Sequence, residues 1–265
     1  APATQQQDST TMIQREDQIQ EWMQLSTQIY QNAETAVNVL SDLLNYDKIQ
    51  MGTLTLELSQ FSILHALEKT VHEFKIAARE RNIDLIMDLS GLVEPSGDDD
   101  GDDVENPKRK RITNVKELPK KLQDMMVVAD EVRLAQVFRN LLSNGLKFSN
   151  EKSTLRVKVS SRKLPRKKQK EESFSLLKDE HITAIQRATV FIDVEDEGAG
   201  MTPQQVKTVF NDGTQFNANQ FQAGGGSGLG LNIAQGIVKE HNGKLVCSSQ
   251  GLGKGTTFTL SLPIY

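Results

Sequence analysis

The sequence contains a single cysteine, Cys247, among its 265 residues. One cysteine excludes an internal disulfide and a multi-cysteine zinc site, and it suits a reducing compartment. No apolar run approaches the roughly 20 residues that a bilayer-spanning helix needs. The first residues, APATQQQDST, lack the basic start and the apolar run of a signal peptide. We therefore expect a cytoplasmic chain; because it begins without Met, we also allow for a longer parent protein anchored in a membrane.

The chain also lacks a strong charge of one sign. It has 31 Lys and Arg against 35 Asp and Glu, a formal net charge of −4. No global basic surface points to nucleic acid, so we expect no nucleic-acid partner. Apolar residues make up 37% of the sequence and charged residues 25%, which is enough for a packed core. The length fits one large domain or two modest ones.

A long amphipathic helix is predicted for residues 18–49, with a polar lead-in before it. Apolar residues recur at steps of three and four and so share one stripe: Trp22, Leu25, Ile29, Ala33, Ala36, Leu40 and Leu43. The stripe either packs on the chain's own body or pairs with a second copy in a helical bundle. Residues 1–17, in which Gln is frequent, are expected to be disordered.

Residues 53–265 alternate between strand and helix patterns. Period-two alternation predicts these strands: 53–58, 83–89, 154–160, 188–195, 244–249 and 256–262. Helices are predicted over 62–80, after Asp130 and after Gly230. Two segments with blocks of like charge and few apolar residues, about 95–112 and 161–172, are expected to be solvated insertions. The basic run inside the first insertion is also compatible with nuclear localisation or an acidic partner.

The helix after Asp130 combines a buried face with a polar one. Asp130 suits the N-cap position. The apolar residues are Leu134, Val137, Phe138, Leu141 and Leu142. Asn140, Asn144 and Lys147 lie within about 40° of one line at 100° per residue. Asparagines on a helix are usually only solvated, but two amide oxygens beside an ammonium also suit a magnesium ion held with polyphosphate.

Two glycine-rich segments follow. Asp196 ends a strand beside Gly198 and Gly200, where a carboxylate can accept the amine of a purine and the glycines admit the base. Residues 224–230 lead directly into a helix, where backbone N–H groups and the helix dipole bind phosphate. The spacing departs from G-x-G-x-x-G, and no Gly-Lys pair precedes Ser or Thr. The dinucleotide fold and the P-loop are therefore both disfavoured.

In four segments the chain resembles the ATP-binding domain of sensor histidine kinases, a branch of the superfamily of gyrase, heat-shock chaperone and mismatch-repair ATPases. The segments are DEVRLAQVFRNLLSNGLKFS, DEGAGM, GGGSGLGLNIAQGIVKEHNG and GKGTTFTLSLP. The resemblance covers most of residues 53–265. It implies an α+β fold, a two-layer α/β sandwich with a mixed sheet and helices on one face, and it implies ATP and Mg²⁺ as ligands.

The resemblance also implies roles for single residues. Asn144 should bind Mg²⁺ with support from Asn140, Lys147 should reach phosphate, and Asp196 should accept from the adenine amine. The other expected ATP-binding residues are Gly198, Gly200, Gly226, Gly228, Leu229, Gly230 and Thr256. A lid of about residues 201–227 is expected to cover the phosphates.

The expected reaction follows from Asn140. Relatives that hydrolyse ATP carry a glutamate there as general base, and an amide cannot take a proton from water. The resemblance therefore implies transfer of the γ-phosphoryl group to a histidine rather than hydrolysis. Asn140 also argues against assignment to the related mitochondrial dehydrogenase kinases, which resemble the ATPases in keeping the glutamate.

Residues 18–52 resemble the second helix of the dimerisation and phosphoacceptor hairpin of these kinases, but the first helix with its H-E-x-x-T-P motif is absent from the sequence. The resemblance implies an acceptor histidine helix and a response-regulator receiver domain supplied elsewhere, and a homodimer through residues 18–49. No phosphoacceptor is assigned here: His72 is expected on a helix surface and His241 as a cation at a helix end. The alternative is a nucleotide-binding pseudokinase or scaffold that acts through its N-terminal helix.

Overall fold

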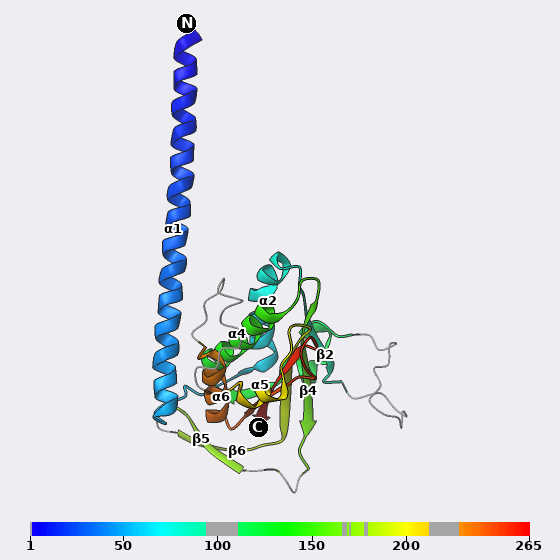
Figure 1. Ribbon diagram of the computed structural model, residues 1–265. Helices are drawn as coiled ribbons and strands as arrows, with labels where there is room; N and C mark the ends of the chain where they lie inside the picture. The colour runs from blue at the N-terminus through cyan, green and yellow to red at the C-terminus, as the bar shows by residue number, and fades with distance from the viewer. Residues whose placement is uncertain (1, 94–110, 166–168, 170, 178–179, 212–227) are drawn as a thin grey trace. The chain divides into compact units, whose positions relative to one another are not determined.

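The computed structural model describes residues 2–93, 111–165, 169, 171–177, 180–211 and 228–265 (Figure 1). The chain divides into two compact units, residues 1–47 and 48–265. The division falls inside helix α1 (Pro2–Gln50), slightly before the boundary expected at residues 52 and 53. Within the described ranges, none of the helices combines the length and the apolar character that crossing a bilayer requires.

Helix α1 begins much earlier than expected. The prediction of a disordered lead-in over residues 1–17 is wrong, because the backbone is helical from Pro2 onward. Gln is a good helix former, and proline is tolerated in the first turn, where its missing N–H would have no partner. The helix ends at Gln50, before Gly52 with its φ of 64°, as the sequence predicted.

A five-stranded sheet forms one layer of the second unit. Its order is β2 (Asp84–Gly91), β4 (Thr154–Lys163), β7 (Ala188–Asp196), β9 (Thr256–Ile264) and β8 (Lys244–Ser248). The β2–β4 pair is parallel and the other three pairs are antiparallel, so the sheet is mixed. The predicted strands over 83–89, 154–160 and 188–195 and the C-terminal hairpin are confirmed.

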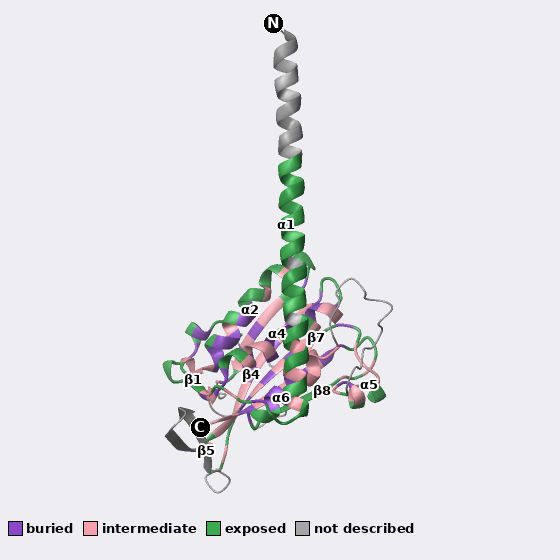
Figure 2. Cartoon of the chain, turned by 90° about the vertical axis from the view of Figure 1, so that its left-hand side faces the viewer, coloured by how far each residue is buried: buried purple, intermediate pink, exposed green. Residues whose placement is uncertain are grey.

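Three helices form the second layer, on one face of the sheet: α2 (Ile63–Glu80), α4 (Glu131–Phe148) and α6 (Gly230–Glu240) (Figure 1). Buried residues gather between the helices and the sheet (Figure 2). Both faces of this interface contribute fully buried side chains, among them Leu64, Phe138, Leu141, Leu155, Ile192 and Ile237. The arrangement confirms the predicted two-layer α/β sandwich.

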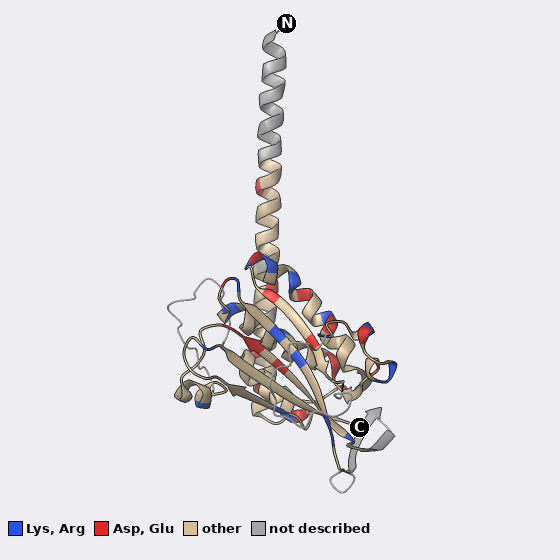
Figure 3. Cartoon of the chain, turned by 90° about the vertical axis from the view of Figure 1, so that its right-hand side faces the viewer, with Lys and Arg blue, Asp and Glu red and all other residues tan. Residues whose placement is uncertain are grey.

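The opposite face of the sheet carries charged residues of both signs (Figure 3). Lys158 on β4 pairs with Glu195 on β7 at 2.9 Å between Nζ and Oε2. Along each strand the buried and half-buried residues alternate, as the pleat requires for a sheet that packs on one side. This alternation is what made these strands predictable.

The smaller elements surround this sandwich. The two-stranded antiparallel pair of β1 (Ser59–Ser62) and β3 (Met126–Ala129) precedes α2 and α4. The 3₁₀ helix η1 (Val115–Glu117) and helix α3 (Lys120–Gln123) lie between β2 and β3 in the chain. Helix α5 (Pro203–Thr208) starts with a capping box made by Thr202 and Gln205.

Two sequence predictions about this unit need correction. Residues 53–58 belong to no sheet, although Leu54 is buried as the alternation implied; instead, the N–H of Glu57 donates to the Asp130 carboxylate at 3.0 Å. Residues 161–172 are not one solvated insertion, because β4 continues to Lys163 and β5 (Glu171–Leu177) pairs with β6 (Glu180–Ile185). The insertion expected over 95–112 lies almost entirely outside the described residues.

Candidate functional site

Helix α4 supports the candidate site. Its N-cap is Asp130, whose Oδ1 accepts from the N–H of Arg133 at 3.1 Å. All five predicted apolar residues of this helix are buried: Leu134, Val137, Phe138, Leu141 and Leu142. At Gly145 the helix approaches β4 so closely that an added Cβ would come within 2.5 Å of the Leu155 side chain. The position of α4 against the sheet is therefore fixed by packing along its length.

The polar residues predicted on this helix are half-buried. Asn140 donates from Nδ2 to the carbonyl oxygen of Gly230 at 2.9 Å, across 90 positions of sequence. This hydrogen bond joins Gly230, the first residue of α6, to α4 and occupies the amide nitrogen, so Oδ1 is the Asn140 atom suited to a cation. Asn144 follows one turn later, and the Nζ atom of Lys147 lies 5.6 Å from the centre of the Phe148 ring.

The start of α6 has the features of an anion site. Gly228 has a φ of 72°, a conformation that glycine adopts without strain. Leu229 is the N-cap residue, and an aliphatic side chain offers no acceptor to the first N–H groups of the helix. Helix N-termini with this composition bind phosphate through those N–H groups and the helix dipole. Gly226, which we also predicted to bind ATP, lies outside the described residues.

Asp196 forms the second part of the site, at the end of β7. The residue is 9% exposed, and Oδ1 accepts from the N–H groups of Gly198 at 2.9 Å and Thr256 at 3.2 Å. Burial raises the pKa of Asp196 above its ordinary 3.8, and the two backbone hydrogen bonds oppose that rise. Both of these hydrogen bonds fall on Oδ1.

The glycines beside Asp196 are required by close backbone contacts. A Cβ on Gly198 would lie 1.9 Å from the carbonyl oxygen of Phe148, the last residue of α4. A Cβ on Gly200 would lie 2.1 Å from the carbonyl oxygen of Gly251, and Gly200 has a φ of 63°. The Asp196 loop therefore packs against the end of α4, while Gly230 contacts the same helix at Asn140. All three predicted segments meet along α4.

Sequence reasoning missed the residues that hold this loop from the side of β8. Ser249 accepts at Oγ from the N–H of Met201 at 3.0 Å and donates to the carbonyl oxygen of Gly255 at 2.6 Å. Cys247 Sγ lies 3.9 Å from Met201 Sδ. Burial, with a smaller contribution from the Asp196 charge, raises the pKa of the Cys247 thiol to about 12. The only local sequence signal for this arrangement is a serine shortly before the glycine-rich turn at residues 251–255.

The two histidines singled out from sequence behave differently. His72 is exposed on α2, as expected for a surface helix residue. His241 is not a helix-end cation; that prediction is wrong, because the residue is buried and its ring accepts a hydrogen bond from the N–H of Asp130 at 2.9 Å. Burial lowers the pKa of His241 below its ordinary 6.5. The hydrogen bond with Asp130, which is distant in sequence, outweighs the preference for a positive charge at the C-terminal end of a helix.

The part of the chain that the structure describes holds no group of three or more His, Cys, Asp or Glu residues arranged for a metal ion. The amide oxygens of Asn140 and Asn144 are hard ligands, and magnesium is typically bound by few protein ligands together with phosphate oxygens. The donor set fits Mg²⁺ bound jointly with a nucleotide.

Comparison with known proteins agrees with this geometry. Among curated proteins, the hybrid signal transduction histidine kinase D of Dictyostelium discoideum is 25% identical over 88% of this chain, and the Arabidopsis thaliana histidine kinase 1 is 25% identical over 86%. The autoinducer 2 sensor kinase/phosphatase LuxQ of Vibrio vulnificus is 26% identical over 88%. The chain spans only 14% to 21% of the length of these three relatives.

Solved structures share the fold. Full-length ShkA in complex with AMPPNP superimposes with a TM-score of 0.57 at 19% identity, over 87% of this chain and 36% of that one. Histidine kinase ThkA in complex with response regulator protein TrrA has a TM-score of 0.50 at 18% identity, over 86% of this chain and 49% of that one.

The family comparison covers the site itself. Residues 129–265 match the model of the "Histidine kinase-, DNA gyrase B-, and HSP90-like ATPase" family. This range contains Asn140, the Asp196 loop and the start of α6, all of which meet along α4. The chain belongs to the family of histidine kinase-, DNA gyrase B- and HSP90-like ATPases.

Proposed function

We propose that this chain is the ATP-binding catalytic part of a histidine kinase in two-component phosphorelay signalling. It would transfer the γ-phosphoryl group of ATP to a histidine that is not in this chain. The observation that carries the proposal is the convergence on α4 of a buried carboxylate, Asp196, and a glycine-rich helix start at Gly230. The first suits an adenine amine and the second suits phosphates.

Each end of a bound ATP has a matching group. Asp196 Oδ2 would accept from the exocyclic amine, with Gly198, Gly200 and Thr256 around the base. Gly228, Leu229 and Gly230 would bind phosphate oxygens through backbone N–H groups, and Lys147 would add a point charge. We propose Gly226 and the lid of about residues 201–227 for the same phosphates, on the sequence pattern alone.

Magnesium would be held by Asn144, with Asn140 in support. When bound, the ion neutralises charge on the phosphates of ATP. The protein's part is to orient these amides: the hydrogen bond from Asn140 Nδ2 to Gly230 O leaves Oδ1 as the ligand atom and ties the metal position to the phosphate loop. A single hydrogen bond thereby links the two halves of the phosphate site.

The reaction that fits is phosphoryl transfer rather than hydrolysis. Asn140 stands where a hydrolytic enzyme of this superfamily carries a glutamate, and an amide does not deprotonate water. An unprotonated imidazole nitrogen of the acceptor would form the new P–N bond as the bond from the γ-phosphorus to the bridging oxygen breaks, and ADP would leave. The site would act by positioning and by electrostatic stabilisation.

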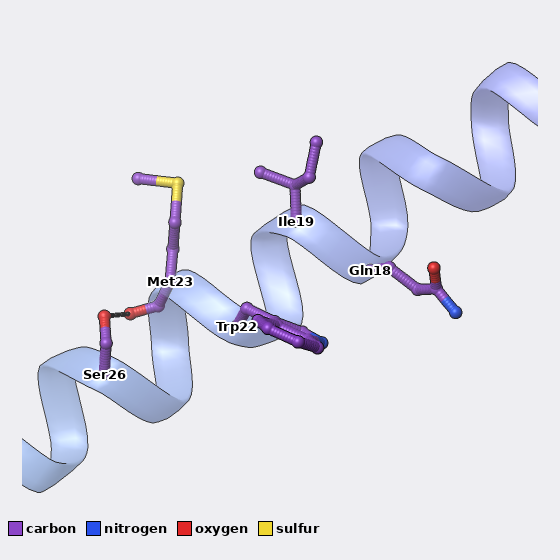
Figure 4. Close-up of a pocket in the computed structure, with 5 residues that line it drawn as sticks. All are labelled: Gln18, Ile19, Trp22, Met23 and Ser26. Carbon is purple, nitrogen blue, oxygen red and sulfur yellow. Dashed lines mark hydrogen bonds between the residues drawn. The ribbon is translucent and has the colours of Figure 1, made fainter.

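We further propose that residues 18–49 pair with a second copy of the chain. Trp22 is 74% exposed and Ile29 is 68% exposed in this helix. Figure 4 shows Ile19, Trp22 and Met23 with Gln18 and Ser26 on α1, where these five residues line a pocket. A helix with so many exposed apolar residues gains free energy by burying them against another helix. A parallel copy would supply the same stripe.

The remaining partners follow from the proposed reaction. A phosphoacceptor histidine helix would receive the phosphoryl group, and a response-regulator receiver domain would take it next; the ThkA complex with TrrA is an example of such a pair in a protein with this fold.

An ATP site and one free cysteine, Cys247, suit the reducing interior of a cell. We therefore propose a cytoplasmic location.

Calorimetric titration with a non-hydrolysable ATP analogue, with and without magnesium, tests the binding half of this proposal. We expect magnesium-dependent binding at micromolar to sub-millimolar strength, about −5 to −8 kcal/mol. The catalytic half is tested by adding radiolabelled ATP and a separately made acceptor helix, with a His-to-Ala acceptor as control. Acid-labile, base-stable phosphohistidine on the acceptor supports a kinase. Binding without transfer to a competent acceptor would instead favour a pseudokinase or scaffold.

A further inference from the structure

His241 is held in one protonation state by its hydrogen bonds. Its Nε2 lies 2.9 Å from the main-chain nitrogen of Asp130, and its Nδ1 lies 2.7 Å from the carbonyl oxygen of Ile237. An amide N–H can only donate and a carbonyl oxygen can only accept, so Nε2 carries the lone pair and Nδ1 carries the proton. The buried ring is therefore a neutral imidazole, and both of its nitrogens are used.

Asp130 extends this contact to two further segments. Its Oδ1 accepts from the N–H of Arg133 and caps α4, and its Oδ2 accepts from the N–H of Glu57 at 3.0 Å. The Nε atom of Arg133 lies 3.3 Å from the same Oδ2. Glu57 belongs to residues 53–58, the linker that follows α1. The His241–Asp130 contact thus joins the end of α6, the start of α4 and the linker.

The two helices are hydrogen-bonded to each other at two places. The start of α4 meets the end of α6 through Asp130 and His241, and the middle of α4 meets the start of α6 through Asn140 and Gly230. At 1.5 Å per residue, the stretch from Asp130 to Asn140 measures about 15 Å and the stretch from Gly230 to His241 about 16.5 Å. Both contacts therefore act on the register of α6 against α4.

We propose that His241 is a positioning residue for the nucleotide site: its neutral ring holds α6 in register with α4, and protonation of the ring releases this contact and weakens nucleotide binding. The inference rests on the proposed ATP site, since the second contact, between Asn140 and Gly230, lies where the phosphates and their magnesium ion would be held. A protonated ring would direct an Nε2–H group at the N–H of Asp130, and two donors repel.

The surroundings of the ring favour the neutral form at neutral pH. Burial is the largest influence and lowers the pKa of His241; the charged groups that face the ring are Asp130 and Arg133 from α4 and Glu240 from its own helix. The carboxylates of Asp130 and Glu240 favour protonation, and Arg133 opposes it. Glu57 of the linker presents its backbone to Asp130, and its residue is exposed. The contact is complete above pH 6.5 and is lost as pH falls through the lower pKa of the folded state.

The full chain with the substitution His241→Gln tests the proposal. A glutamine Oε1 can accept from the N–H of Asp130 but does not titrate, so the variant should bind the ATP analogue as the wild type does at pH 7.5. As pH is lowered from 7.5 through the folded-state pKa of His241, the wild-type affinity should fall more steeply than the affinity of the variant. Titration of the analogue's own phosphates and of Asp196 affects both proteins equally. His72→Gln, at an exposed histidine of α2, should follow the wild-type profile.

Equal pH profiles for the wild type and His241→Gln would overturn the proposal. A wild type that fails to bind the analogue at pH 7.5 contradicts the proposed function. In that case the protonation state of His241, measured without ligand, tests the positioning role separately. In ¹⁵N-histidine spectra of the wild type, His241 should appear as the Nδ1–H tautomer with a pKa below 6.5. An Nε2–H tautomer, or titration at or above 6.5, would overturn the positioning role even if the variant did not fold.

Discussion

The main-chain nitrogen of Thr256 lies 3.2 Å from Oδ1 of Asp196, although 60 positions separate the two residues. Together with the N–H of Gly198, this contact holds Oδ1 between two backbone donors. The protein thus keeps a buried acidic group, whose pKa is raised by burial, at the end of a central strand. A buried carboxylate is costly for stability and typical of a binding site.

Asp196→Asn should separate binding from stability. The amide keeps an acceptor for both N–H groups but replaces the oxygen that would accept from adenine, so affinity for the ATP analogue should fall about 10- to 100-fold. Affinity for pyrophosphate should change by less than about two-fold, because pyrophosphate has no base. Asp193→Asn is the matched control: it lies on the same strand and bonds to Thr259 on the open face of the sheet. Equal losses for analogue and pyrophosphate would make Asp196 structural.

The same substitution should change the pH dependence of unfolding. Because the folded-state pKa of Asp196 lies above 3.8, the folded protein binds the proton more tightly than the unfolded chain. Its contribution to stability therefore decreases as pH rises from 3.8 through the raised pKa. Relative to Asp196→Asn, the wild type should lose stability over this window, as measured by urea unfolding at a series of pH values. A wild type that gains stability there contradicts the assignment.

Asn144→Ala should bind the ATP analogue with equal affinity in the presence and absence of magnesium. The physical reason is that the substitution removes the amide oxygen that would bind the ion and leaves the backbone phosphate contacts in place. Ser143→Ala, on the exposed side of the same helix, should keep the magnesium dependence. Calorimetry with and without EDTA provides the comparison. A persistent magnesium effect in Asn144→Ala would move the metal site elsewhere.

Two glycines in the turn between β8 and β9 offer a matched pair. Gly253 and Gly255 have φ values of 72° and 69°, so alanine at either carries the cost of the left-handed conformation, about 1 kcal/mol. A Cβ at Gly253 meets nothing within 4 Å, whereas one at Gly255 would lie 1.9 Å from the carbonyl oxygen of Asp196. We expect Gly255→Ala to cost at least about 3 kcal/mol in urea unfolding and to impair analogue binding. Similar costs for the two variants would disprove this clash.

Cys247 should react slowly with iodoacetamide in the native protein. A pKa raised from 9.0 to about 12 lowers the reactive thiolate fraction at pH 8 by roughly 1,000-fold. Urea-unfolded protein should react at the rate of an ordinary cysteine. Mass spectrometry of the alkylated fraction over time measures both rates, and native labelling as fast as labelling in urea would contradict a raised pKa for the half-buried Cys247 thiol.

Features that depend on neighbours in sequence were predictable. Ser62 and Asp130 cap helices that begin at the next residue, and strands that pack on one side show their alternation directly. The kinds of chemical group in the candidate site could also be predicted from the sequence, because asparagine, aspartate and glycine each permit few roles. These local signals, together with the resemblance to histidine kinase ATP-binding domains, were sufficient to predict the two-layer α/β sandwich.

Features that depend on residues distant in sequence could not be predicted. The Thr53–Leu58 pattern has strand character, yet the N–H of Glu57 donates to a carboxylate 73 positions away. His241 looked like a solvated helix-end cation, and only its packing against Asp130 makes it neutral. The Asn140–Gly230 hydrogen bond likewise joins residues whose order in sequence carries no sign of contact. Orientation of the site residues therefore required the structure.

The last turn of α1 sets the minimum length of a fragment that preserves the second unit. Ile49 lies against α6, where a Cβ on Gly236 would come within 2.5 Å of its side chain. A fragment starting at Thr53 would lack Ile49, so the apolar surface of α6 that Ile49 contacts would be exposed and would promote self-association. Limited proteolysis should therefore leave a stable core that starts before Lys48, and crystallisation or drug-screening fragments should retain that turn.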